Sequence, residues 1–253
     1  MKHKVLAICK SFLWCFVILI FPIVSGAVSV IFSLDTDTTL FVQGTFMTMA
    51  FIVPAILVFI GKWQWRDIGF APFDYKECKR AFYFIPLLVL FIPAAIKGFY
   101  VKSIGYITGN LFLYLFVGLS EEVYFRGIIP RYLKKEFSIK GIILWSAFIF
   151  GIGHAATAFT GSNGCETALT VLNAFIFGWL AIEMTIISSN IIPAVLLHFL
   201  FDFETKIVVM NGNELLTAEI IRGIIMFIIA IWFAGVIDKI KNEEPKLANG
   251  FCG

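Results

Sequence analysis

The sequence predicts an all-α protein, a polytopic membrane helix bundle with about eight transmembrane helices, in a single membrane-embedded domain over residues 1–253. Composition is one reason, because 60% of the residues are apolar and 15% are charged, whereas a soluble domain is about half apolar and about a quarter charged. The other reason is the length of the apolar runs, which approach the roughly 20 residues of one helical crossing. These runs alternate too weakly for the strands of a membrane barrel.

The candidate spans follow one another with short polar connections. The first run, with its basic start and Ser25-Gly26-Ala27, also resembles a cleaved signal peptide, but it continues to Phe32 and is long enough to cross. Residues 62–80, rich in Trp and charged side chains, indicate an amphipathic element at the membrane surface. In chain order, the predicted spans are 11–33, 40–61, 81–97, 107–130, 140–159, 167–187, 190–208 and 218–238.

Most Lys and Arg residues fall in loops on one side of these spans, which by the positive-inside rule places both termini in the cytoplasm. We therefore expect an integral, multi-pass protein of a bacterial cell membrane, in contact with membrane lipid. The net charge of +3 is distributed over these loops and gives no support for a nucleic-acid partner. The five cysteines lack C-x-x-C spacing, so neither a disulfide framework nor a cysteine zinc cluster is indicated.

Several ionisable side chains lie inside the predicted spans, where each costs about 2.5–3.5 kcal/mol on insertion scales. At 1.5 Å per residue, they lie roughly 12 to 21 Å from the cytoplasmic side, in one layer of the bundle. Apart from His3 near the terminus, both histidines of the chain belong to this layer. The residues are Glu121, Glu122 and Arg126 in the fourth span, His154 in the fifth, and His198 and Asp202 in the seventh.

Local pairing explains some of these residues as structural. Glu122 and Arg126 have the i, i+4 spacing of an ion pair on one helix face, and His198 and Asp202 have the same spacing. Glu121 has no such partner in its own helix. We therefore expect a residue from another helix to engage Glu121, and a histidine is the natural candidate.

This set of side chains favours peptide hydrolysis with water as the nucleophile. A carboxylate and a neutral imidazole can take a proton from water and return it to the leaving amine, while a second imidazole stabilises the oxyanion. Glu121, His154 and His198 are equally a possible set of ligands for Zn²⁺ or another divalent metal. Because no Gly-x-Ser-x-Gly motif occurs, covalent catalysis is disfavoured.

The same residues resemble the motifs of the CAAX proteases and bacteriocin-processing enzymes, the CPBP or Abi family. The resemblance covers residues 107–205 as a catalytic core, and residues 65–70 are similar to a segment that often precedes that core. The motifs E-E-x-x-x-R, F-x-x-x-H and H-x-x-x-N/D correspond to Glu121, Glu122 and Arg126, to Phe150 and His154, and to His198 and Asp202.

The resemblance implies an eight-helix intramembrane endopeptidase of the metallo or glutamate type. It implies that Glu121 activates water with help from His154, that His198 and Asp202 stabilise the oxyanion, and that Glu122 and Arg126 support them. The third motif ends in Asp202 where eukaryotic CAAX prenyl endopeptidases carry Asn, and an ionised Asp is a poor donor. Asp202 is therefore expected to orient His198 or to be protonated.

The substrate expected from the resemblance is a peptide or a lipid-modified protein, in bacterial peptide maturation or bacteriocin immunity. Two alternatives stay open. A proton-coupled transporter also carries buried ionisable residues, and Glu183 and Arg222 are not explained by the protease motifs. A non-enzymatic immunity or scaffold protein would keep the motif residues for packing alone.

Overall fold

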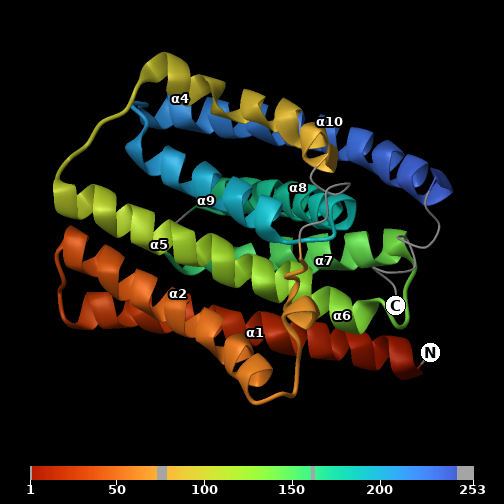
Figure 1. Ribbon diagram of the computed structural model, residues 1–253. Coiled ribbons are helices and arrows are strands. Elements are labelled where there is room, and N and C mark those ends of the chain that lie inside the picture. The colour runs from red at the N-terminus through yellow and green to blue at the C-terminus, as the bar shows by residue number, and fades with distance from the viewer. Residues whose placement is uncertain (1, 73–78, 161–162, 244–253) are drawn as a thin grey trace.

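The prediction of an all-α bundle is confirmed. The computed structural model describes residues 2–72, 79–160 and 163–243, with only the backbone at 159 and 160, and in these ranges the regular elements are helical. One isolated antiparallel β-bridge, between Phe99 and Val208, ties two connections together. Figure 1 shows the elements in chain order.

The helices have these bounds: α1 Lys2–Ile31, α2 Thr36–Phe59, η1 Trp65–Ile68, η2 Ala81–Phe91, α4 Ile92–Lys97, α5 Ile104–Glu122, η3 Val123–Ile128, α6 Ile129–Leu133, α7 Ile139–Gly153, η4 His154–Thr160, α8 Gly164–Ser188, α9 Ile192–Ile207 and α10 Gly212–Glu243. Three of the η elements, η1, η2 and η4, are 3₁₀-helices, and η3 is a single π-helical turn.

All the predicted spans are helical. Within the described ranges, six helices are long and apolar enough to cross a membrane, namely α1, α2, the continuous stretch Ile104–Leu133, the stretch Ile139–Ala158, α8 and α10. The other two predicted spans are shorter. Ala81–Lys97 is an apolar helix of intermediate length, and α9 has 16 residues. The bundle is therefore polytopic, with two of its helices shorter than a full crossing.

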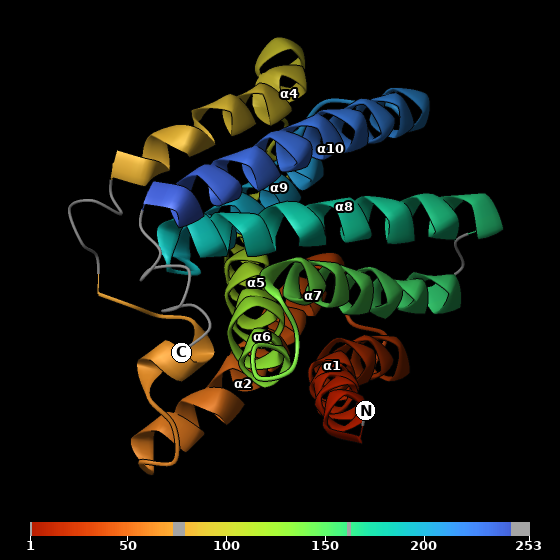
Figure 2. The same ribbon diagram turned by 90° about the vertical axis from the view of Figure 1, so that its right-hand side faces the viewer.

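The helices stack in layers around α5 and α8 (Figures 1 and 2). Helix α5 packs against α2 on one side and α9 on the other, while α8 packs against α7 and α10. The start of α1 and the end of α10 lie at the same end of the bundle in Figure 1. We call this the basic end; it also holds η1 and the end of α6. The distal end holds the starts of α5, α8 and α10 and the end of α9.

The segment after α2 differs from the predicted surface element. Ile68 in η1 is fully buried, the Gly69 carbonyl accepts a hydrogen bond from the Ile191 amide at 3.1 Å, and the Asn190 side chain donates to the Ala71 carbonyl at 2.6 Å. These contacts dock residues 65–71 into the bundle, although Trp65 stays exposed. The part of the predicted element at 73–78 lies outside the described residues.

The span 81–97 also differs from a regular α-helix, because its first part, η2, is a 3₁₀-helix. Pro86 lies inside η2, and a second proline, Pro93, lies in the first turn of α4. Proline has no N–H to donate and its ring crowds the preceding turn, so two prolines so close together disfavour an uninterrupted α-helix.

A π-helical turn follows directly after Glu122. Pro130 lacks an N–H group and its ring would clash with the carbonyl four residues earlier, which disfavours a regular α-helix here. The Ile129 amide bonds instead to the Tyr124 carbonyl, five residues back. The Phe125 carbonyl that this shift frees accepts a hydrogen bond from the Ser146 hydroxyl at 2.8 Å. The turn is thus satisfied by α7.

Two glycines permit the close approaches around this turn. A Cβ at Gly118 would lie 3.1 Å from the Val195 carbonyl oxygen, so glycine lets α5 approach α9 next to His198. A Cβ at Gly127 would collide with the Ile68 backbone, so glycine lets η1 dock on the π turn. Small residues commonly allow such close contacts between membrane helices.

Candidate active site

Four of the predicted residues line one cavity of about 280 Å³, enclosed by α5, α7, η4, α8, α9 and α10. Glu121 comes from α5, His154 from the start of η4, and His198 and Asp202 from α9. Residues 121 to 202 are far apart in the chain, so their convergence is a property of the fold. The remaining predicted residues, Glu122 and Arg126, lie next to this layer.

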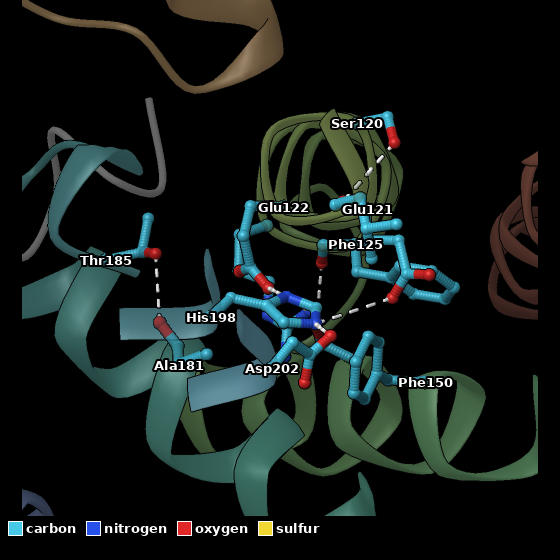
Figure 3. A network of polar contacts seen from close by, with 12 residues as sticks. Ser120, Glu121, Glu122, Phe125, Phe150, Ala181, Thr185, His198 and Asp202 are labelled. Atoms are coloured by element: carbon cyan, nitrogen blue, oxygen red, sulfur yellow. Dashed lines mark hydrogen bonds and ion pairs between the residues drawn. The ribbon is translucent and has the colours of Figure 1, made fainter. Parts of the chain in front are cut away.

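His198 is the centre of the polar contacts (Figure 3). Its Nδ1 lies 2.8 Å from Glu122 Oε1, and its Nε2 lies 3.5 Å from Asp202 Oδ2 and 3.9 Å from Glu121 Oε2. The first distance is a hydrogen bond, while the last is longer than one. The predicted pairing of His198 with Asp202 is present. The bond to Glu122, across the bundle, was not predicted.

Glu122 and Arg126 form a fully buried ion pair behind His198. Arg126 Nη1 lies 3.0 Å from Glu122 Oε1, with both side chains at 0% exposure, and this is the predicted i, i+4 pair. The guanidinium also lies 4.2 Å from the centroid of the Phe150 ring, with the Phe125 and Phe177 rings within 6 Å. Aromatic rings stabilise a cation over their faces, which compensates part of the cost of burying the charge.

Glu121 has the unsatisfied carboxylate that the sequence predicts. Within the described part of the chain, its Oε2 atom is buried and accepts no hydrogen bond. The nearest cationic group is His198 Nε2 at 3.9 Å, so the expected histidine from another helix is present at ion-pair distance. Glu121 lines the cavity and its side chain keeps 18% exposure, so part of this side chain is accessible to a reacting molecule although Oε2 itself is buried.

His154 is placed at the point where α7 ends and the 3₁₀ turn η4 begins. Its Nδ1 lies 3.0 Å from the Phe150 carbonyl oxygen. A carbonyl only accepts hydrogen bonds, so Nδ1 carries the proton and Nε2 of the neutral ring keeps its lone pair. The Phe150 of the second motif therefore fixes the tautomer of His154 through its backbone.

The described residues do not form a metal site in this arrangement. No group of three or more His, Cys, Asp or Glu side chains among them is placed to hold a metal ion. That Glu121, His154 and His198 hold a divalent metal stays a prediction.

Three further polar side chains were missed by sequence reasoning. Arg222 Nη2 donates to both carboxylate oxygens of Glu204 on α9, at 2.6 and 2.7 Å, and Arg222 Nε donates to the Leu90 carbonyl. Lys206 and Glu219 line the same cavity as the predicted set. All three side chains lie near the ends of predicted spans, where charged residues at the membrane interface are common. Glu183, in contrast, accepts from the Trp179 ring N–H at 2.8 Å, away from this cavity.

Comparison with known proteins agrees with the motif analysis. The family model described as "Type II CAAX prenyl endopeptidase Rce1-like" matches residues 103–203, which contain all the predicted site residues. No curated protein and no solved structure matches the chain. The match supports an intramembrane protease of the CAAX type, embedded in the membrane through several helices. The predicted resemblance to the CAAX protease family is thus confirmed, and residues 103–203 are its Rce1-like region.

Proposed function

We propose that this protein is an intramembrane endopeptidase that hydrolyses a peptide bond with water activated by Glu121 and His154. The observation that carries the proposal is the convergence of Glu121, His154, His198 and Asp202 on one cavity from separate helices. Packing alone does not require an acid and two imidazoles to meet at a cavity wall, because each could be satisfied within its own helix.

Water activation is assigned to Glu121 and His154. Glu121 Oε2 accepts no hydrogen bond from the described residues, and the lone pair on His154 Nε2 is free because Nδ1 donates to Phe150. A water molecule between these groups would lose a proton as its oxygen attacks the carbonyl carbon. The proton is held by this pair and then passes to the nitrogen of the leaving amine as the C–N bond breaks.

Stabilisation of the oxyanion is assigned to His198. Its two ring nitrogens face carboxylates, Glu122 at Nδ1 and Asp202 with Glu121 at Nε2, so the ring is favoured as an imidazolium with two protons. The Nε2–H group then donates to the carbonyl oxygen as negative charge develops on it. Asp202, an acceptor when ionised, orients His198 and does not itself donate.

Glu122 and Arg126 are assigned as positioning residues. Glu122 accepts from His198 Nδ1, and Arg126 holds Glu122 from the other side at 3.0 Å. The aromatic rings of Phe125, Phe150 and Phe177 surround the guanidinium, so the pair has little freedom to move. A rigid second layer of this kind keeps the catalytic ring within hydrogen-bond reach of its partners.

The proposed substrate is a peptide or lipid-modified protein of a bacterial cell membrane, as in peptide maturation or bacteriocin immunity. The rival transporter hypothesis, based on the buried ionisable residues, drew added support from Glu183 and Arg222. Arg222 is neutralised by Glu204, and Glu183 accepts from Trp179, so both have structural partners.

The test is cleavage of a library of internally quenched peptides by the purified protein in liposomes. We expect Glu121→Gln and His154→Gln to abolish turnover while the melting temperature stays close to that of the wild type. Glu183→Gln is the matched control, because it removes a buried acid outside the cavity and should retain activity.

Other outcomes would favour the other classes. Equal turnover by wild type and both variants would remove the proposal. Solute flux that depends on Glu121 without cleavage would favour a transporter, and lowered stability with no activity in any assay would favour a scaffold. A parallel assay with a divalent-metal chelator measures the metal requirement, since loss of turnover that added Zn²⁺ restores would make the enzyme a metalloprotease.

A further inference from the structure

The cavity continues beyond the catalytic residues toward the distal end of the bundle. Its outer wall is polar: Thr170 and Asn173 come from α8, Thr205 and Lys206 from the end of α9, and Glu219 from the beginning of α10. Each of these residues lies between the catalytic layer and the distal end of its helix. The cavity therefore has a catalytic inner part and a polar outer part.

The catalytic layer is closed in the opposite direction. Toward the basic end it is backed by fully buried side chains, including Tyr124, Arg126, Ile128 and Leu180. The docking of η1 on the π turn, through Ile68, adds a further layer there. A substrate segment that reaches Glu121 through this cavity thus passes the polar outer part first.

Glu219 is the acid in this outer part, and the positive charges of Lys206 and Arg222 lie near enough to act on its carboxylate. Among the residues that the structure describes, it makes no hydrogen bond or ion pair, although Glu219 is half-buried. Two other acids buried in the bundle form ion pairs, Glu122 with Arg126 and Glu204 with Arg222. Glu183 instead accepts from the Trp179 ring N–H, and Glu121 has the His198 ring at 3.9 Å. An unpaired acid inside a membrane helix is costly and indicates a function.

The charges of the cavity favour a cationic ligand. Three carboxyl side chains line it, Glu121, Asp202 and Glu219, against two cationic groups in its described lining, Lys206 and the His198 ring assigned as an imidazolium, so negative charge is in excess. Lys206 Nζ is directed to the Tyr114 ring, 5.8 Å from its centroid. An excess of carboxylates in a cleft surrounded by protein of low dielectric constant focuses a negative potential that attracts cations.

Helices α8 and α9 indicate the same distance along the bundle between Glu219 and the catalytic layer. On α8, Asn173 donates to the Glu219 backbone at 3.3 Å, while Phe177, one turn inward, packs 4.8 Å from the His198 ring. Four residues of helix span about 6 Å. On α9 the same four residues separate Asp202 from Lys206. An extended peptide covers about 6 to 7 Å with two residues.

We propose that Glu219 is a specificity-determining residue that binds a cationic side chain, Lys or Arg, located about two residues from the scissile bond of the peptide substrate. The inference rests on the proposed function, because it assigns the substrate class of that site. The ammonium or guanidinium group would form an ion pair with the Glu219 carboxylate, while the chain continues inward between α8 and α9 to Glu121.

The experiment measures binding and cleavage with the same peptides. The substrates are a series of internally quenched peptides with an apolar centre. Each peptide carries one Lys, Gln or Glu, and the position of that residue changes from one peptide to the next. Binding is measured to the protein with Glu121→Gln, by fluorescence anisotropy in detergent micelles, and cleavage is measured with Glu121 intact. We expect Lys about two residues from the cleaved bond to lower Kd and KM roughly 10- to 100-fold relative to Glu.

Glu219→Gln should remove this preference, and Glu219→Lys should reverse it in favour of the Glu peptide. Glu166→Gln is the matched control, because it changes the same charge in the first turn of α8 at the distal end, outside the cavity lining. Melting temperatures of all variants establish that they fold. If Glu219→Lys does not fold, the nearly isosteric Glu219→Gln is sufficient to test the preference for Lys.

The two proposals fail in different ways. Equal binding and cleavage of Lys and Glu peptides, or a Lys preference that survives Glu219→Gln, would overturn the role of Glu219 and leave the protease in place. Charge-selective binding that depends on Glu219, with no cleavage of any peptide by the wild type, would support this site and overturn the proposed hydrolysis.

Discussion

Replacing Arg126 by Met tests the assigned role of the buried ion pair. Both side chains of the Glu122–Arg126 pair are at 0% exposure, and their charged atoms are 3.0 Å apart. Arg126→Met keeps an unbranched side chain among the aromatic rings but removes the guanidinium from Glu122, which leaves the His198 ring as the remaining partner of that carboxylate. Breaking one partner of a buried pair costs about 3–5 kcal/mol, so we expect a loss of that size in the free energy of unfolding, measured by SDS titration in mixed micelles.

The double variant with Glu122→Gln and Arg126→Met separates charge pairing from packing. Gln retains an oxygen that accepts from His198 Nδ1, and no buried charge is left unpaired. We therefore expect the double variant to regain most of the stability, within about 1–2 kcal/mol of the wild type, since neutral replacement of a buried pair is often tolerated. If the two single losses simply add in the double variant, the coupling that we assign to this pair does not exist.

Three other predictions use stability, turnover and labelling. Gly127→Ala should lower the free energy of unfolding by about 1–3 kcal/mol in the same titration, because its Cβ would collide with the backbone of η1, whereas Gly235→Ala, with open space around it, should be neutral or stabilising. Arg222→Leu should cost about 3–5 kcal/mol by leaving Glu204 unpaired, yet retain turnover at low temperature, since neither residue lines the cavity. In a variant with Cys165 as its single cysteine, a membrane-impermeant maleimide should label Cys165 in intact cells, because α8 begins at the distal end. If Cys165 is protected in intact cells and labelled in inverted vesicles, the proposed orientation is reversed.

Sequence patterns predicted features that depend on local periodicity. The apolar runs predicted eight spans, all of which are helical, because the length of a crossing is set by the bilayer. The i, i+4 rule gave the Glu122–Arg126 and His198–Asp202 pairs, both of which are present. Counting helical rise placed the ionisable side chains in one layer, and four of them line one cavity. The catalytic roles assigned to these residues remain predictions.

Apart from the histidine expected beside Glu121, contacts between distant segments were not predicted. Glu122 was assigned to Arg126 alone, but the same oxygen also accepts from His198, 76 residues away in the chain. The π turn arises from Pro130 together with Ser146 on another helix, and no single-segment pattern contains both. The docking of Ile68 likewise depends on Gly127, which is far from it in sequence.

The consecutive acids of the first motif have different tasks because adjacent residues on a helix point about 100° apart. Glu121 faces the cavity on the Nε2 side of His198, and Glu122 faces the interior on the Nδ1 side of the same ring (Figure 3). One imidazole is therefore held between neighbouring carboxylates, of which Glu122 is neutralised by Arg126 while the Oε2 atom of Glu121 stays free of hydrogen bonds from the described residues. In the proposed mechanism this asymmetry gives each glutamate its own role, since Glu122 fixes the ring and Glu121 activates the reacting water.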